Sequence, residues 1–135
     1  MRISTVLGSA GPNTTHSDFP NAPYPMTWYH QALANKLAGE DLDPSADIGI
    51  TFNSAIGRPN CIRVGWYFGV DGNEGNQIEL LPVVLHEMGH GLGFSTTTIA
   101  GVEEVYPSIY DRFLLDNTTG LHWHEMAGPI ASPRR

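Results

Sequence analysis

The stretch that decides the fold is IELLPVVLHEMGHGLGFS, residues 78–95. Its apolar residues recur at steps of three and four positions, which predicts an amphipathic helix; they are Leu81, Val84, Leu85, Met88 and Leu92. Gly93 is suited to end such a helix in a left-handed conformation. Gly89 and Gly91 each lower helix propensity by up to about 1 kcal/mol, which indicates that another backbone or a bound group approaches there. We therefore expect a helix over residues 78–92.

The expected helix carries an HExxH pattern formed by His86, Glu87 and His90. Residues four apart lie on one helix face, so both imidazoles can bind one ion, and tetrahedral zinc accepts nitrogen at about 2.0–2.1 Å. Glu87 lies beside the metal rather than on it. There its carboxylate can take a proton from a zinc-acidified water and pass it to the leaving amine. We expect His86 and His90 to bind Zn²⁺ and Glu87 to be the catalytic acid and base.

Other interpretations of this pattern need separate tests. HExxH occurs by accident in amphipathic helices whose polar face carries two histidines. Here it follows an apolar run and is closed by residues 91–94, GLGF, so the helix ends one turn after the second histidine. This context favours a metal site. The alternatives are a zinc-binding but catalytically inactive module and a structural domain without metal.

The longer pattern HEMGHGLGFS, residues 86–95, resembles the metzincin signature HExxHxxG and is most similar to leishmanolysin-like and related bacterial secreted metalloproteases. More weakly, residues 11–111 resemble the amino-terminal half of their catalytic domain. The resemblance implies an α+β, zincin-like fold. Such a fold has a twisted mixed sheet and an HExxH active-site helix, and the helix lies beneath a substrate cleft. It also implies endopeptidase activity on protein or peptide substrates and a secreted or extracellular location.

The third zinc ligand stays open at this point. Typical metzincins place a third histidine three residues after the glycine, where this chain has Thr96, whereas the leishmanolysin-like branch has a long insertion there. The candidates within the chain are two histidines, which can instead be loop residues, and three acids, which can instead be surface charges. They are His122, His124, Glu103, Glu104 and Asp111. A residue absent from this chain is the remaining alternative.

Length and composition limit the class of protein. A chain of 135 residues with 41% hydrophobic and 16% charged residues fits one compact domain, and it fits neither a disordered chain nor a membrane-spanning one. Fourteen acidic residues against seven basic ones give a net charge of −7, so nucleic acid is not expected as a partner. We therefore predict a single catalytic domain over residues 1–135, without a membrane span.

The remaining elements are expected to be short. Residues 1–25 are predicted to be an irregular N-terminal segment, because four prolines between positions 12 and 25 remove backbone donors. Thr27 is placed to cap a helix that Gly39 ends. Two strands are expected, over residues 47–52 and 61–68.

Three observations favour a truncated piece of a larger secreted enzyme. The N-terminal apolar patch is too short for a signal peptide, and Cys61 has no partner for an internal disulfide. In the resembling proteins the third histidine also lies further downstream than this chain extends. The alternative is a complete minimal domain.

Overall fold

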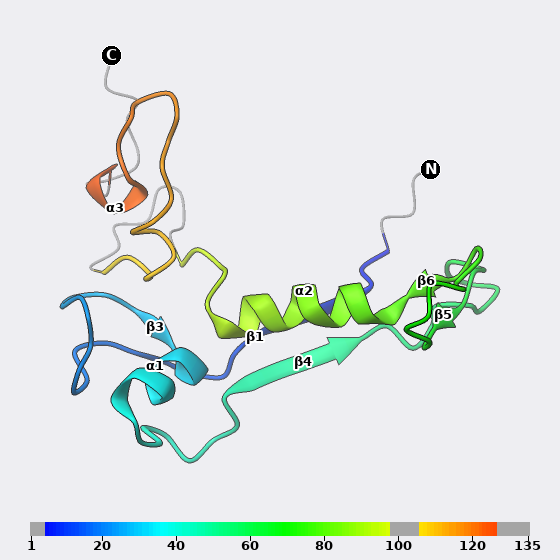
Figure 1. The fold of residues 1–135 in the computed structure, drawn as a ribbon, viewed down its shortest axis with the longest axis horizontal. Coiled ribbons are helices and arrows are strands. Elements are labelled where there is room, and N and C mark those ends of the chain that lie inside the picture. Colours follow the sequence, from blue (N-terminus) through cyan, green and yellow to red (C-terminus); the bar gives the residue numbers. More distant parts are fainter. Residues whose placement is uncertain (1–4, 98–105, 127–135) are drawn as a thin grey trace.

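Helix α2, Leu80–Leu92, is the longest element and lies along the antiparallel strands β1 and β4, which we call the β1–β4 pair (Figure 1). The structure is a computed structural model that describes residues 5–97 and 106–126. It is a small mixed α/β protein, as expected at that coarse level. The other elements are β1 (Gly8–Pro12), β2 (Thr15–His16), β3 (Tyr29–His30), α1 (Gln31–Ala38), β4 (Ile48–Phe52), β5 (Trp66–Tyr67), β6 (Ile78–Glu79) and α3 (Trp123–Met126).

Strands β1 and β4 form an antiparallel pair, in register from Gly8 opposite Phe52 to Pro12 opposite Ile48. The β4 prediction is confirmed, but β1 and β2 lie inside residues 1–25, which were expected to be irregular. This corrects the prediction for the N-terminal segment. The sequence of β1, GSAGP, has no apolar alternation, and the strand forms because its backbone pairs with β4.

Among residues 5–97 and 106–126, the strands form three two-stranded sheets. Besides β1–β4, strands β2 and β3 pair antiparallel and strands β5 and β6 pair in parallel. The strand expected over residues 61–68 shortens to Trp66–Tyr67, and residues 61–65 form bends after a turn at residues 59–60. One anchor of this segment is Asn53, whose carbonyl accepts the Trp66 indole N–H at 3.0 Å.

The cluster of buried apolar residues lies at α1 rather than at α2. Phe19, Tyr29 and Ala34 form this cluster, and the rings of Phe19 and Tyr29 meet edge to face at 5.2 Å. Helix α1 ends at Gly39, as predicted, in a left-handed conformation with φ of 78°. It begins later than Thr27 because Tyr29 and His30 form β3 and pair with β2.

Helix α2 matches its prediction closely and ends at Gly93, whose φ is 121°. A neighbour does approach Gly91 closely, but it is a side chain and not the backbone or bound group that was predicted, because an added Cβ would lie 2.9 Å from Ile48 Cδ1. The neighbour is thus a side chain of β4. At Gly89 the nearest such atom is Phe94 Cδ2 at 4.0 Å, so that position has room.

Four of the five apolar residues that predicted α2 are exposed, and the fifth, Val84, is half-buried. We call Leu81, Leu85, Met88 and Leu92 the apolar face of α2, and they are 45%, 62%, 42% and 45% exposed. The buried residues of the helix are instead Glu87 and Gly91, which face the β1–β4 pair. The β1–β4 pair therefore covers a different side of α2 from the apolar face.

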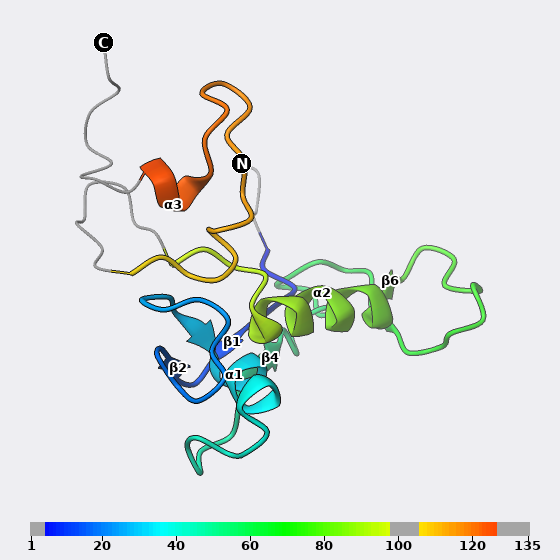
Figure 2. The ribbon, with the colours of Figure 1, turned by 60° about the vertical axis from the view of Figure 1, so that its left-hand side comes forward.

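The last described segment, residues 106–126, contacts the rest through a bridge between Trp28 and Ser108. A turn follows at residues 116–120, as predicted, with the Gly120 amide donating to the Asp116 carbonyl at 2.8 Å. Helix α3 lies apart from α2 in two views (Figures 1 and 2). Within residues 5–97 and 106–126, no helix has the length and apolar character to cross a membrane.

Candidate metal centre

Helix α2 brings His86 and His90 together one turn apart, and we call this pair the histidine face. Their Nε2 atoms are 3.1 Å apart, and their ring centroids are 4.7 Å apart in an edge-to-face arrangement. His86 is exposed and His90 is half-buried, because the β1–β4 pair covers the neighbouring side of the helix. The α-helical repeat is therefore enough to direct both Nε2 atoms at one point.

The spacing of the two nitrogens fits a shared zinc ion. Two ligands about 2.0–2.1 Å from a tetrahedral zinc lie about 3.4 Å from each other. The observed Nε2–Nε2 distance of 3.1 Å is close to that value. A small adjustment of either ring is sufficient, so the pair can supply two of the ligands of a tetrahedral site.

A hydrogen bond to the turn after α2 fixes the His90 ring. Its Nδ1 lies 2.8 Å from the Phe94 carbonyl oxygen. A carbonyl only accepts, so Nδ1 carries the proton and the lone pair of neutral His90 is on Nε2, facing His86. In the 3.1 Å contact His86 Nε2–H is then the donor. Binding an ion requires His86 to hold its proton on Nδ1 instead.

Glu87 lies between the histidine face and the β1–β4 pair and is 8% exposed. Strand β1 approaches it most closely at Gly8, where an added Cβ would lie 3.2 Å from Glu87 Cγ and 3.0 Å from Phe52 Cδ1. Among the described residues the Glu87 carboxylate has no hydrogen-bond or ion-pair partner. The carboxylate therefore keeps its acceptor capacity, and its aliphatic stem is confined by β1.

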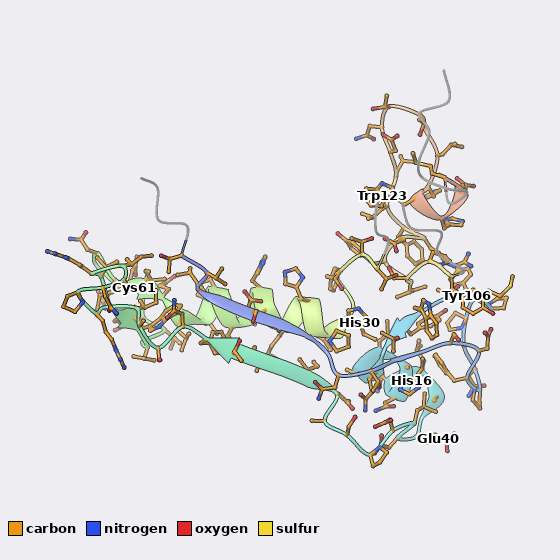
Figure 3. All side chains as sticks on the ribbon, turned by 180° about the vertical axis from the view of Figure 1, so that it is seen from behind. His16, His30, Glu40, Cys61, Tyr106 and Trp123 are labelled. Atoms are coloured by element: carbon orange, nitrogen blue, oxygen red, sulfur yellow. The ribbon has the colours of Figure 1, made fainter. Side chains whose placement is uncertain are left out.

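A third histidine, His30 of β3, lies at the end of α2 (Figure 3). It is 2% exposed, with Nδ1 3.3 Å from the Gly91 carbonyl oxygen and Nε2 3.1 Å from Ser95 Oγ. Burial lowers the pKa of His30 from its ordinary value, against the opposing effect of the Gly91 carbonyl. Sequence reasoning missed this residue, because no spacing rule connects it with a motif 56 to 60 positions away.

The candidates for the third ligand that the structure describes, His122, His124 and Asp111, are not brought to the histidine face. His122 and His124 are near α3, with ring centroids 5.8 Å apart, and α3 lies apart from α2 (Figures 1 and 2). Asp111 is fully buried, and its Oδ2 accepts from the amide and hydroxyl of Ser108 at 3.0 and 2.8 Å. Glu103 and Glu104 lie outside the described residues. Across residues 5–97 and 106–126, no set of three His, Cys, Asp or Glu residues surrounds a common point.

An apolar pocket of about 420 Å³ lies on another side of α2, between the helix end, α1 and residues 109–113. Leu92 lines this pocket together with Leu33 and Phe113, and the pocket therefore continues the apolar face. Its surface is almost entirely apolar, with Lys36 as the charged residue that lines it. The pocket thus has space for an apolar group, and Lys36 and Tyr110 are the titratable residues that line it.

No protein-family model, curated protein or solved structure matches this chain.

Proposed function

We propose that the protein is a zinc-dependent endopeptidase of the metzincin type. The observation that supports it most directly is the histidine pair on α2, whose Nε2 atoms lie 3.1 Å apart. The hydrogen bond from His90 Nδ1 to the Phe94 carbonyl adds to this, because ligand histidines in metal sites commonly donate their other N–H in this way. The helical repeat by itself accounts for the approach of the two rings, whereas the hydrogen bond from His90 to Phe94 is a further feature that a chance HExxH helix does not need.

Zinc, when bound by His86 and His90, supplies an acidified water and polarises the scissile carbonyl. The role of Glu87 is to accept the proton and to return it to the leaving amine. Its position next to His86 and the absence of a competing partner among the described residues support this role. Confinement by β1 at Gly8 limits the rotamers that the Glu87 stem can adopt.

The proposal extends to the features that accompany the metzincin resemblance of residues 86–95. These are a zincin-like arrangement of sheet and helix, protein or peptide substrates, and a secreted or extracellular location. The proposal leaves the third zinc ligand unassigned. The candidates for it are His122, His124, Glu103, Glu104 and a residue that is not in this sequence. Asp111 is the weakest of the candidates, because Ser108 already occupies its Oδ2.

The test is cleavage of an unstructured protein substrate by the purified chain, with and without a chelator. We expect cleavage that stops with the chelator and returns when zinc is restored. Glu87→Gln should retain zinc and lower turnover by about 10²- to 10⁴-fold, the usual contribution of a general acid–base residue. Glu79→Gln, the same change just before α2, is the matched control. Cleavage that is insensitive to the chelator, or full activity of Glu87→Gln, would contradict the proposal.

A second candidate is a zinc-binding module without catalysis. It is favoured by the burial of Glu87, which is 8% exposed, and by the two ligands of α2 where catalytic zinc sites use three. This candidate predicts stoichiometric zinc in the wild-type chain and no cleavage of the substrate. The assay above separates the two candidates, because only the endopeptidase loses activity on Glu87→Gln.

A further inference from the structure

Two histidines contact residues 91–95, which comprise the last residues of α2 and the turn that follows. His90 donates from Nδ1 to the Phe94 carbonyl at 2.8 Å. His30 contacts the Gly91 carbonyl at 3.3 Å and the Ser95 hydroxyl at 3.1 Å. The orientation of the His90 ring therefore depends on a turn that His30 contacts at both of its ends.

The protonation of His30 follows from its two contacts. The Gly91 carbonyl only accepts a hydrogen bond, so His30 Nδ1 carries the proton. Neutral His30 then presents an acceptor at Nε2, and the Ser95 hydroxyl donates to it. Both ring nitrogens are satisfied in this tautomer, and the side chain is 2% exposed, so the surrounding structure fixes the ring.

The backbone of the same turn gives the arrangement little freedom. Gly93 ends α2 with a φ of 121°, and the Phe94 amide donates to the Gly89 carbonyl at 3.0 Å. These bonds set the path of the chain but do not anchor it to another element. Three contacts with other segments supply that anchor. The Ser108 hydroxyl donates to the Ser95 carbonyl at 3.4 Å, and the Tyr110 ring lies 6.1 Å from the Phe94 ring, centroid to centroid. The third is His30, which belongs to β3, pairs with Thr15 of β2, and contacts both Gly91 and Ser95.

We propose that His30 is a positioning residue for the metal centre, which fixes the turn at residues 91–95 and through it the ring of His90. This inference rests on the proposed zinc site and adds to it a residue that is distant in sequence. His30 does not touch the metal. Its effect passes from Gly91 and Ser95 to the Phe94 carbonyl, and from there to His90 Nδ1.

The test compares four variants of the whole chain by zinc affinity, measured in competition with a chelator. His30→Asn removes the contact with Ser95, and Ser95→Ala removes its hydroxyl. Ser95→Thr keeps a hydroxyl and serves as the rescue, while His16→Asn makes the same histidine change on β2, the partner strand. We expect about a tenfold loss of zinc affinity for His30→Asn, in the range known for outer-shell partners of metal ligands. Ser95→Ala should lose less, and Ser95→Thr and His16→Asn should remain close to the wild type.

Two further readouts separate positioning from general stability. The visible absorption of the Co²⁺-substituted protein reports ligand geometry and should change in His30→Asn but not in His16→Asn. In the metal-free protein, hydrogen exchange of the Phe94 amide should accelerate in His30→Asn, while the amides of β1 and β4 keep their rates. A uniform acceleration over all these elements would show a general structural role and overturn the proposal.

The outcomes for the two proposals are distinct. Unchanged zinc affinity and an unchanged cobalt spectrum in both His30→Asn and Ser95→Ala would overturn the positioning role and leave the zinc site intact. A wild-type chain that binds no zinc would overturn the proposed function. In that case unaltered exchange at Phe94 in His30→Asn would overturn the anchoring of the turn as well. If His30→Asn does not fold, Ser95→Ala decides alone, because the Ser95 side chain is only half-buried.

Discussion

The histidine face and the apolar face of α2 lie on the same thirteen-residue helix but differ in how the rest of the chain treats them. Successive residues are about 100° apart around a helix, so the two faces point in roughly opposite directions. The histidine face has defined partners, with His90 bonded to the Phe94 carbonyl at 2.8 Å. The apolar face is open, and Leu85 is 62% exposed. The ligand pair thus needs only the helix and its closing turn, whereas an apolar face needs a second layer to bury it.

The largest expected effect tests the histidine face directly. His90→Ala removes one of the two nitrogens that lie 3.1 Å apart and should abolish zinc binding, as measured by elemental analysis of the purified protein. His122→Ala and His124→Ala are the comparison variants, since both histidines are near α3. Full zinc retention in His90→Ala would place the site elsewhere. Loss of zinc in a variant of His122 or His124 would identify the third ligand.

The next effect contrasts the buried cluster with the apolar face. Phe19 packs against Tyr29, and Phe19→Ala should lower the free energy of unfolding by about 3–5 kcal/mol. Leu85→Ala should change it by less than about 0.5 kcal/mol, because the side chain is largely exposed. Urea titration measures both. A loss for Leu85→Ala as large as that for Phe19→Ala would mean that the apolar face is covered in solution.

Substitutions at two glycines of α2 test whether one side of the helix packs against the β1–β4 pair. Gly91→Ala places a methyl group against Ile48 and should lower the free energy of unfolding by about 1–3 kcal/mol. Gly89→Ala is the matched control, with room for the methyl group, and should raise this free energy by up to about 1 kcal/mol through helix propensity. Unfolding in urea gives both values. Equal effects of the two substitutions would contradict the packing of α2 on β4.

The smallest effect concerns the pH dependence of the anchor behind the histidine face. Burial lowers the pKa of His30, so the unfolded chain takes up this proton at a higher pH than the native one. The contribution of His30 to stability is therefore complete above about pH 6.5, the ordinary histidine pKa, and is lost as the pH falls below it.

Urea titrations of the metal-free protein on both sides of this pH, for the wild type and His30→Asn, measure the contribution. We expect the variant to lose less stability on acidification than the wild type does. Equal losses would show that His30 is not the group responsible.

Patterns of local spacing predicted the elements that concern the site. The three- and four-residue recurrence and the helix stop at Gly93 predicted α2 within two residues of its start, because both depend on neighbours along the chain. Strand β4 and the end of α1 at Gly39 followed in the same way. Strand β1 did not, since GSAGP carries no periodic signal and is a strand only by pairing with β4. The contacts of His30 were equally beyond reach, because Gly91 lies 61 residues away.

The sequence by itself determined that His86, Glu87 and His90 share one helix and that the two imidazoles face one point. The physical reason is the α-helical repeat, which sets the positions of residues four apart whatever surrounds them. Tertiary structure decided which side of α2 is buried. The β1–β4 pair packs where Gly91 leaves room for the Ile48 side chain and Gly8 leaves room for the Glu87 side chain. It also decided that a buried histidine from β3 anchors the turn beside His90, since such contacts form only when distant segments fold together.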